Sequence, residues 1–477
     1  MQLSPRKDGP QKPLRTAFVA AIGGFLFGYD LGLIGAANVY LEEQFSLSPA
    51  ALGFATASAV LGCILGPFLG AWVCDAIGRK KTMIFAAALL AASALFTAVP
   101  DVLADGTDRG VMRSFNFFRF LGGLGVGLCS IASPMYIAEL SPPSRRGRLG
   151  LMYQLAVVLG HAVAPLIAWT IVSWLRIGYG VEQGDVPYSW SLQPWRWMFL
   201  SEVVSVTIFA GFLFRLPESP RWLAAHGRFG EAEAILCKVD GPDFAASELQ
   251  AIRFSLRADE GRWADLLAPG MRWALFIGIM LAFFNNWTGW SVIGGYVPRL
   301  FEAAGYRRED AIRDFVFVYG AMGALTLISI CLADRLGRRP LWIFASALGI
   351  LITFLCGLVF AWGWQGTIVL IVIALITLPH GLALGGLPWL MMSELFPTRL
   401  RAKAVAVTTT TLWVFIFTGV YLFPLITSWS DRIFGSVAGA FWLFTVVCIF
   451  SLLFGWLVMP ETRGRSLEDI GDSWNEP

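Results

Sequence analysis

Charged residues are scarce in this chain of 477 residues. Asp, Glu, Lys and Arg together make up 14% of it, whereas about a quarter of an ordinary soluble domain is charged. Hydrophobic residues account for 56% of the chain, and long apolar runs follow one another from end to end. This composition excludes a soluble protein with a single membrane anchor and predicts a polytopic membrane protein.

The short alternating segments of a membrane β-barrel are also missing. An α-helix needs about twenty apolar residues to cross the hydrocarbon of a bilayer. We therefore predict an all-α membrane protein with twelve transmembrane helices. Their centres fall near residues 27, 61, 90, 125, 161, 204, 283, 322, 350, 379, 414 and 446.

Several other signals are absent. The basic start of the chain leads into a full-length span without a small-residue cleavage site, which argues against a cleaved signal peptide. The seven cysteines lie in spans or predicted cytoplasmic loops, which argues against disulfides. We find no nucleophile–base pair, phosphate-binding loop or metal-ligand spacing, so we predict no enzyme, cofactor or metal. The net charge of +3 is carried by loops and does not imply a nucleic-acid partner.

The cations that are present fall in alternate loops. Examples are "GRKK" (78–81), "SRRGR" (144–148) and "DRLGRR" (334–339). Because Lys and Arg of short loops stay on the cytoplasmic side, both termini are predicted to face the cytoplasm from a cell membrane.

An internal repeat divides the chain into two halves. Three motifs recur in the same order, namely "DAIGRKK" with "DRLGRRP", "AELSPPSRRGR" with "SELFPTRLRAK", and "PESPR" with "PETRGR". The polar segment between the halves has helical spacing. We predict a six-helix bundle over 1–217, a small cytoplasmic helical domain over 218–270, and a second six-helix bundle with a short tail over 271–477.

These ordered motifs resemble the sugar porter family of the major facilitator superfamily along the whole chain. The resemblance implies two pseudo-symmetric bundles that move a monosaccharide or polyol by alternating access. We also predict that the protein is a monomer. It also implies a cytoplasmic charge network that joins the halves when the cavity opens outward. Its members would be Asp75, Arg79, Glu139, Arg146, Glu218, Asp334, Arg338, Glu394, Arg401 and Glu461. The alternative, that these cations only set topology, does not explain the matched acids.

Three ionisable residues lie within predicted spans: Asp30, Arg119 and Glu202. A charge at the bilayer centre costs about 2.5–3.5 kcal/mol on insertion scales, and such groups normally pair inside the bundle and mark ion or proton routes. If Arg119 approached Asp30 in one conformation only, the proton affinity of Asp30 would depend on the direction in which the cavity opens. The resemblance likewise assigns these residues to proton symport. A permanent ion pair that orders the packing is the alternative.

Glycines recur every four residues in the first two spans, at Gly24, Gly28 and Gly32 and at Gly62, Gly66 and Gly70. Such patterns allow close approach of helices. They are common in membrane bundles, so they permit a sliding contact without requiring it.

The substrate positions implied by the resemblance depart from the family pattern. They are Gln154, His161, Asn285, Asn286, Ser291, His380, Trp389 and Trp413, with Tyr296 as a gating residue. Asn285, Asn286 and Ser291 are shorter than the family's amides, Leu412 replaces an expected amide, and the two histidines are unusual. A hydroxylated solute still finds donors, acceptors and an aromatic platform here. Open alternatives are a small organic acid, a proton-independent facilitator, and a nutrient sensor.

Overall fold

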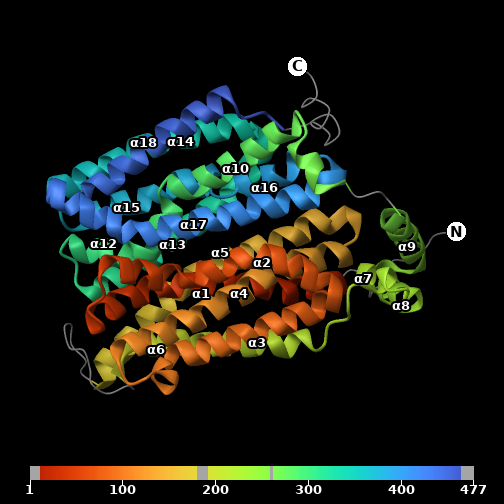
Figure 1. Cartoon of the computed structure of the whole chain (residues 1–477), viewed down its shortest axis with the longest axis horizontal. Coiled ribbons are helices and arrows are strands. Elements are labelled where there is room, and N and C mark those ends of the chain that lie inside the picture. The colour runs from red at the N-terminus through yellow and green to blue at the C-terminus, as the bar shows by residue number, and fades with distance from the viewer. Residues whose placement is uncertain (1–10, 180–191, 258–260, 463–477) are drawn as a thin grey trace.

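The long apolar segments form helices because a helix satisfies all of its backbone hydrogen bonds internally, as hydrocarbon requires. The computed structural model describes residues 11–179, 192–257 and 261–462, and these residues contain helices and no strand. Figure 1 shows the long helices running along one common direction.

The first half of the chain contains six long helices. They are α1 (Gln11–Gln44), α2 (Pro49–Ile77), α3 (Arg79–Ala98), α4 (Asp108–Leu140), α5 (Pro143–Tyr179) and α6 (Pro194–Leu213), with a short 3-10 turn η1 (Pro100–Leu103). Large buried side chains such as Phe115, Trp195 and Phe199 fill the space between them.

Three short helices follow, α7 (Pro220–Ala225), α8 (Phe229–Asp240) and α9 (Pro242–Arg257), and then the 3-10 turn η3 (Trp263–Leu267). The helical prediction for the connecting segment is therefore confirmed. Helices α7 to α9 lie together at one end of the long helices (Figure 1). The domain boundaries at 217 and 270 stay a prediction.

The second half has more interruptions. Its elements are α10 (Met271–Trp287), α11 (Trp290–Ile293), η4 (Gly294–Tyr296), α12 (Val297–Ala303), α13 (Arg308–Leu336), α14 (Arg338–Ala361), α15 (Thr367–Pro379), the π-helical turn η5 (His380–Leu384), α16 (Leu387–Glu394), α17 (Thr398–Phe434) and α18 (Ala438–Leu457). Its core contains Phe284, Phe315 and Trp342.

Among the described residues, eleven helices are long and apolar enough to cross a membrane, and a bent pair makes twelve. Each of the twelve predicted centres lies within one of these segments, so the prediction of twelve spans is confirmed. The bent pair joins Met271–Trp287 to Trp290–Ala303 at 51°. Gly289 has a φ of +124° at the break, a conformation that favours glycine.

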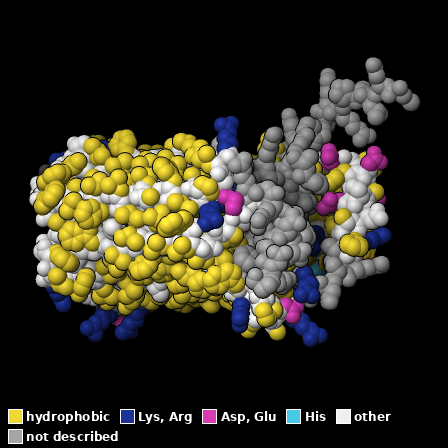
Figure 2. All heavy atoms as spheres, turned by 90° about the horizontal axis from the view of Figure 1, so that it is seen from above, with side chains coloured by type: hydrophobic (Ala, Val, Ile, Leu, Met, Phe, Trp, Pro, Cys, Tyr) yellow, Lys and Arg dark blue, Asp and Glu magenta, His cyan; other side chains and the backbone are white. Residues whose placement is uncertain are grey.

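The outer surface fits a membrane environment. Hydrophobic side chains cover most of the face shown in Figure 2, while acidic and basic side chains gather toward the end that carries α7 to α9. The turns Gly78 and Gly337, each followed by cations, belong to this end, which we call the basic end.

The glycines of α1 and α2 lie at helix crossings. A Cβ on Gly28 would stand 2.0 Å from the carbonyl oxygen of Val157 in α5, and one on Gly66 would stand 2.3 Å from the Cα of Gly127 in α4. The absence of a side chain at these points lets the backbones touch. Helix α1 is thereby held directly against α5.

Candidate functional site

A cavity of about 450 Å³ lies between the two halves, near the middle of the long helices. Helices α1, α2, α4 and α5 of the first half line it, together with α10, α11, α13, α16, α17 and the turns η4 and η5 of the second. Clefts of this size between bundled helices are common sites for small molecules.

On the first-half wall, α5 presents Gln154 and His161 to the cavity. The two residues are seven apart, so they lie on one helix face. His161 Nδ1 donates to the carbonyl of Val157 at 3.0 Å, which leaves Nε2 as an acceptor in the neutral ring. The His161 ring stacks on Tyr319 of α13, with centroids 5.5 Å apart. The two halves therefore meet at this histidine.

On the second-half wall, five predicted residues line the cavity: Asn285, Ser291, His380, Trp389 and Trp413. Asn285 donates to the carbonyls of Leu384 and Gly385, both at 2.8 Å. Its amide thereby ties α10 to the π-helical turn that carries His380. π-Helical turns frequently occur at functional positions.

Asn286 and Tyr296 do not belong to the cavity wall. Asn286 Nδ2 donates to the carbonyls of Ala282 and Leu412, at 2.9 and 3.4 Å. Neighbouring residues of a helix point about 100° apart, so Asn285 faces the cavity and Asn286 faces α17. Tyr296 is fully buried, and its hydroxyl donates to the carbonyl of Val420 at 2.7 Å.

Three buried polar atoms of wall residues have no hydrogen-bond partner within the described part of the chain. They are Tyr153 Oη, His380 Nδ1 and Trp413 Nε1. Burying such atoms unpaired costs free energy, so they suit a solute or water that pairs with them. The wall residues include no Asp, Glu, Lys or Arg. The cavity is thus built for hydrogen bonding rather than for a fixed charge.

The three ionisable residues of the spans come together inside the first half. Asp30 of α1 and Arg119 of α4 form an ion pair, and both side chains are almost completely buried. Glu202 of α6 is 1% exposed, and Asp30 and Arg119 are its charged neighbours. Both carboxylate oxygens of Glu202 and Oδ2 of Asp30 lack a hydrogen-bond partner among the described residues. We call Asp30, Arg119 and Glu202 the buried triad.

The buried triad is one helix away from the cavity. Helix α1 carries Asp30, and its Phe27 and Leu31 line the cavity wall. A Cβ on Gly28 would lie 2.8 Å from both the backbone nitrogen and Nδ1 of His161. A movement of α1 that changes the Asp30–Arg119 contact would therefore also move against the α5 wall.

At the end opposite the basic end, hydrogen bonds and ion pairs join the two halves. Asn38 Nδ2 donates to the carbonyl of Gly295 at 2.8 Å. Arg299 pairs with Glu42 at 2.8 Å, and Arg308 pairs with Glu43. These contacts close the cavity at that end.

The cavity is open toward the basic end. Wall residues near the closed end, such as Ile34 and Gly294, are buried, whereas Gln154 and Trp389 are exposed. Trp389 is five residues before Glu394, which pairs with Arg338 of the α13–α14 turn. Trp389 therefore lies on the side of the basic end.

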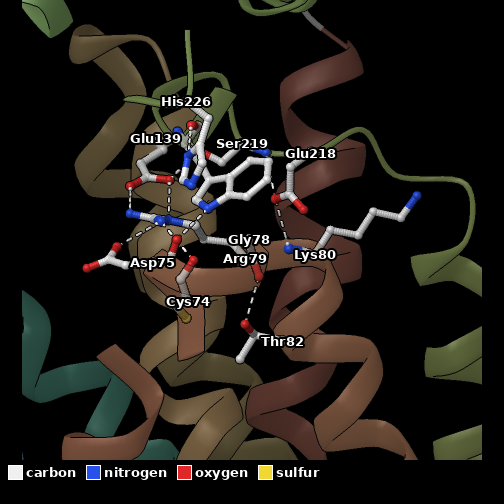
Figure 3. A network of polar contacts seen from close by, with 11 residues as sticks. Cys74, Asp75, Gly78, Arg79, Lys80, Thr82, Glu139, Glu218, Ser219 and His226 are labelled. Carbon is white, nitrogen blue, oxygen red and sulfur yellow. Dashed lines mark hydrogen bonds and ion pairs between the residues drawn. The ribbon is translucent and has the colours of Figure 1, made fainter. Parts of the chain in front are cut away.

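A charge cluster surrounds the α2–α3 turn at the basic end (Figure 3). Arg79 binds both oxygens of Glu139, at 3.0 and 3.1 Å, and Asp75 at 3.0 Å. Such bidentate pairing fixes geometry strongly. Glu218 accepts from the backbone nitrogens of Lys80 and Ser219, at 3.0 and 2.8 Å. Its carboxylate thus sits at the N-terminus of α3, where a negative charge is favoured.

The second half repeats this arrangement at the α13–α14 turn. Arg338 binds Glu394 at 3.2 Å. Glu461 accepts from the backbone nitrogens of Arg338 and Arg339, at 3.1 and 3.0 Å. Gly78 and Gly337 have φ values of +97° and +95°. Gly78 lies against the carboxylate of Glu218, and Gly337 lies against that of Glu461.

The contacts just described join residues within one half. Arg401 donates to the carbonyl of Phe396 at 3.5 Å, also within one half. The side chains of Arg146 and Asp334 lie outside the described residues. The predicted joining of the halves by these charges concerns the outward-open state and stays a prediction.

Several cavity residues are not among the sequence predictions, and Tyr153 and Tyr319 are two of them. Tyr153 is adjacent to Gln154 and carries a polar hydroxyl within a span, so the sequence could have indicated it as a cavity residue. Tyr319 lines the cavity because α13 packs beside α5, and no local pattern indicates that contact.

The comparisons with known proteins agree with this architecture. Residues 16–474 match the family model "Sugar (and other) transporter". The arabinose-proton symporter of Bacillus subtilis is 34% identical and covers 95% of this chain and 93% of its own. The D-xylose-proton symporter of Escherichia coli strain K12 is 32% identical, with 96% and 94% covered.

A solved structure of the xylose transporter XylE from E. coli, described as inward open, superposes with a TM-score of 0.80. It is 29% identical in sequence and covers 96% of this chain and 99% of its own. A family model that spans nearly the whole chain, together with these relatives, shows the family. The chain belongs to the sugar (and other) transporter family, whose members are multi-pass membrane transporters.

Proposed function

We propose that this chain moves a monosaccharide or related polyol together with a proton, by alternating access of one central site. The observation that carries the proposal is the buried triad, sealed one helix away from a cavity that both halves line. Ionisable groups enclosed in a membrane bundle normally mark ion or proton routes. We propose a transporter rather than an enzyme or a sensor.

The charges of the buried triad indicate how a proton is held. One guanidinium faces two carboxyl groups, so full ionisation would leave one uncompensated negative charge away from water. Uncompensated buried charges are strongly destabilising. A proton on Asp30 or Glu202 removes that charge. The triad therefore holds one proton while Arg119 pairs with the remaining carboxylate.

Release of this proton requires the triad to change its contacts. When Arg119 pairs with Asp30, as in this structure, Glu202 is the carboxyl group that lacks a cation of its own. Moving α1 relative to α4 would separate Asp30 from Arg119 and change which carboxyl group is neutralised. Because Gly28 of α1 touches α5, the same movement reshapes the cavity wall. Proton binding and solute binding are thereby linked.

The cavity wall supports a neutral hydroxylated solute. Amide, hydroxyl and imidazole groups alternate with the indoles of Trp389 and Trp413 around the cavity. A sugar presents several hydroxyls and one apolar ring face, and this wall offers partners for both. The atoms left without a partner, Tyr153 Oη, His380 Nδ1 and Trp413 Nε1, are candidates for direct contacts with the hydroxyls.

A small hydroxylated acid is the second candidate substrate. His161 and His380 are the basic side chains of the cavity wall, and they come from opposite halves. Protonated imidazoles would pair with a carboxylate. This candidate predicts uptake that rises as the pH of the side facing the cavity falls.

We further propose that the protein lies in the cell membrane as a monomer with both ends in the cytoplasm. Thr16 near the start of α1 lines the same cavity as Leu140 and Lys238, and Thr462 donates to Glu394 at 2.6 Å. The described parts next to both termini thus lie at the basic end. Cationic loops remain cytoplasmic, which makes this end cytoplasmic and the present cavity inward-facing.

The test is uptake into proteoliposomes with labelled monosaccharides, polyols and sugar acids, with and without an imposed pH gradient. Concentrative uptake of a neutral sugar only with the gradient would support the proposal. Uptake of sugar acids alone would favour the second candidate. Equal uptake with and without the gradient would indicate facilitated diffusion instead of proton symport.

The ion pairs that join the two halves at the end opposite the basic end allow a separate prediction. Replacing Arg299 and Arg308 by Gln removes cross-half partners of Glu42 and Glu43. Partly exposed pairs are worth about 0.2–1 kcal/mol each, so the outward-open population should rise about fivefold. Distances between spin labels at Asp105→Cys and Gln365→Cys would measure it.

The matched control replaces Arg307 and Arg313 by Gln. These cations pair with Asp310 and Asp314 within the second half only, so their loss removes equal charge and no cross-half contact. The same population shift in both double variants would contradict the role of the cross-half pairs.

A further inference from the structure

A second cavity, of about 590 Å³, lies at the basic end, away from the central cavity. Residues of α1, α4, α6 and α8 line it, including Leu140, Leu216 and Ile235. We call it the interfacial pocket. Its walls are largely apolar, with two cations among them.

The position of the interfacial pocket follows from where the spans stop. The span of α1 begins at Thr16, that of α4 ends at Leu140, and that of α6 ends at Leu213. Thr16 and Leu140 line the pocket, as does Phe212, the neighbour of Leu213. Since three membrane helices end around it, the pocket lies at the level of the lipid headgroups. Helix α8 forms the wall that is not a membrane span.

The two cations of the pocket are Arg215, just beyond α6, and Lys238 of α8. Both are exposed, and neither side chain forms an ion pair or hydrogen bond with another described residue. A third cation is close by, because Lys80 Nζ donates to the carbonyl of Phe214 at 3.2 Å. The neighbouring carboxylate of Glu218 accepts from backbone nitrogens and supplies one negative charge against these three cations. The surroundings of the pocket therefore carry a net positive charge.

An apolar stripe leads from these cations along α6 toward the middle of the membrane. Val204, Ile208 and Phe212 are spaced four residues apart and therefore share one face of the helix. Val204 is 63% exposed and Ile208 is 50% exposed, while Phe212 lines the pocket. Arg215 continues this face by one more turn. The order of cation, pocket and apolar stripe matches the order of headgroup, glycerol and acyl chain in a lipid.

We propose that the interfacial pocket binds an anionic phospholipid. Its phosphate lies between Arg215 and Lys238, and one acyl chain follows Phe212, Ile208 and Val204. Basic pockets between membrane helices at the cytoplasmic surface favour anionic headgroups, and guanidinium groups bind phosphate oxygens in charge-assisted hydrogen bonds. The lipid would join α8 to the end of α6. This inference rests on the membrane placement of the spans and not on the transported solute.

The test uses the full chain in neutral detergent with dioleoylphosphatidylglycerol, dioleoylphosphatidylcholine or inorganic phosphate added. Native mass spectrometry counts bound lipid, and thermal unfolding reports stabilisation. We expect the anionic lipid alone to be retained and to raise the melting temperature. The Arg215→Gln/Lys238→Gln variant should bind it about thirtyfold more weakly, because two surface cations are lost.

The matched control is Lys81→Gln/Arg221→Gln, which removes the same charge from exposed positions at this end outside the pocket. The control should retain wild-type binding. A photoactivatable phosphatidylglycerol should label peptides that contain Phe212 and Lys238. Equal weakening in both variants, equal retention of phosphatidylcholine, or full stabilisation by inorganic phosphate would overturn the proposal.

Discussion

Asp30→Asn is expected to abolish accumulation of the solute against its gradient. At one proton per solute, a pH difference of two units sustains about a hundredfold accumulation, because each unit is worth 1.36 kcal/mol. Asn cannot exchange a proton, so the internal concentration in the variant should only reach the external one. Uptake into proteoliposomes with an imposed gradient measures the ratio.

The variant should still fold and exchange solute. Removing one partner of a buried ion pair usually costs about 3–5 kcal/mol, but here Glu202 remains as a second carboxyl group beside Arg119. Solute-for-solute exchange at equal pH is therefore expected to persist. Asp108→Asn, at the first turn of α4, is the matched control and should accumulate normally. Gradient-driven accumulation in Asp30→Asn would refute the assignment of Asp30.

Gly28→Ala is expected to destabilise the protein and to block transport. The new Cβ would stand 2.0 Å from the carbonyl oxygen of Val157, which is backbone and cannot rotate away. Overpacking of a tight contact costs about 1–3 kcal/mol, and α1 must move off α5 to relieve it. Thermal unfolding of the purified protein and the initial rate of solute uptake would both be measured.

Gly211→Ala provides the comparison. Gly211 is also a helical glycine within a span, but nothing beyond the adjacent backbone of its own helix lies within 4 Å of the position of its Cβ. Its replacement should leave the melting temperature and the uptake rate unchanged. If Gly28→Ala behaved like Gly211→Ala, the close approach of α1 and α5 would not be a requirement for transport.

The paired turns illustrate how much a local pattern can predict. "GRKK" and "GRRP" each place a glycine before the cations of a helix start, and the matching "PES" and "PET" motifs supply an acid. The acids were predicted to join a charge network. The structure adds that Glu218 and Glu461 bind backbone nitrogens at the starts of α3 and α14. The polarity of the helix explains this contact. Glu218 is 138 residues from Lys80 and Glu461 is 123 residues from Arg338, so no local sequence pattern predicts it.

The cavity illustrates the opposite case. Asn285 and Asn286 are adjacent and chemically identical, yet one lines the cavity and the other binds α17. The break at Gly289 and the placement of His380 on a π-helical turn likewise depend on packing in the second half. The rotation of each helix about its axis decides which polar group reaches the cavity, and neighbouring helices set that rotation.

The sequence by itself determined that the chain is an all-helical membrane protein with twelve spans, repeated halves and three ionisable residues within the membrane. Length and hydropathy are local properties, and a span must be a helix because hydrocarbon offers its backbone no other partners. Only the tertiary structure decided that Asp30, Arg119 and Glu202 meet, that the cavity closes through Asn38 and Gly295, and that the interfacial pocket exists. These features arise from contacts between distant helices, whose approach and rotation are set by side-chain volume at their crossings.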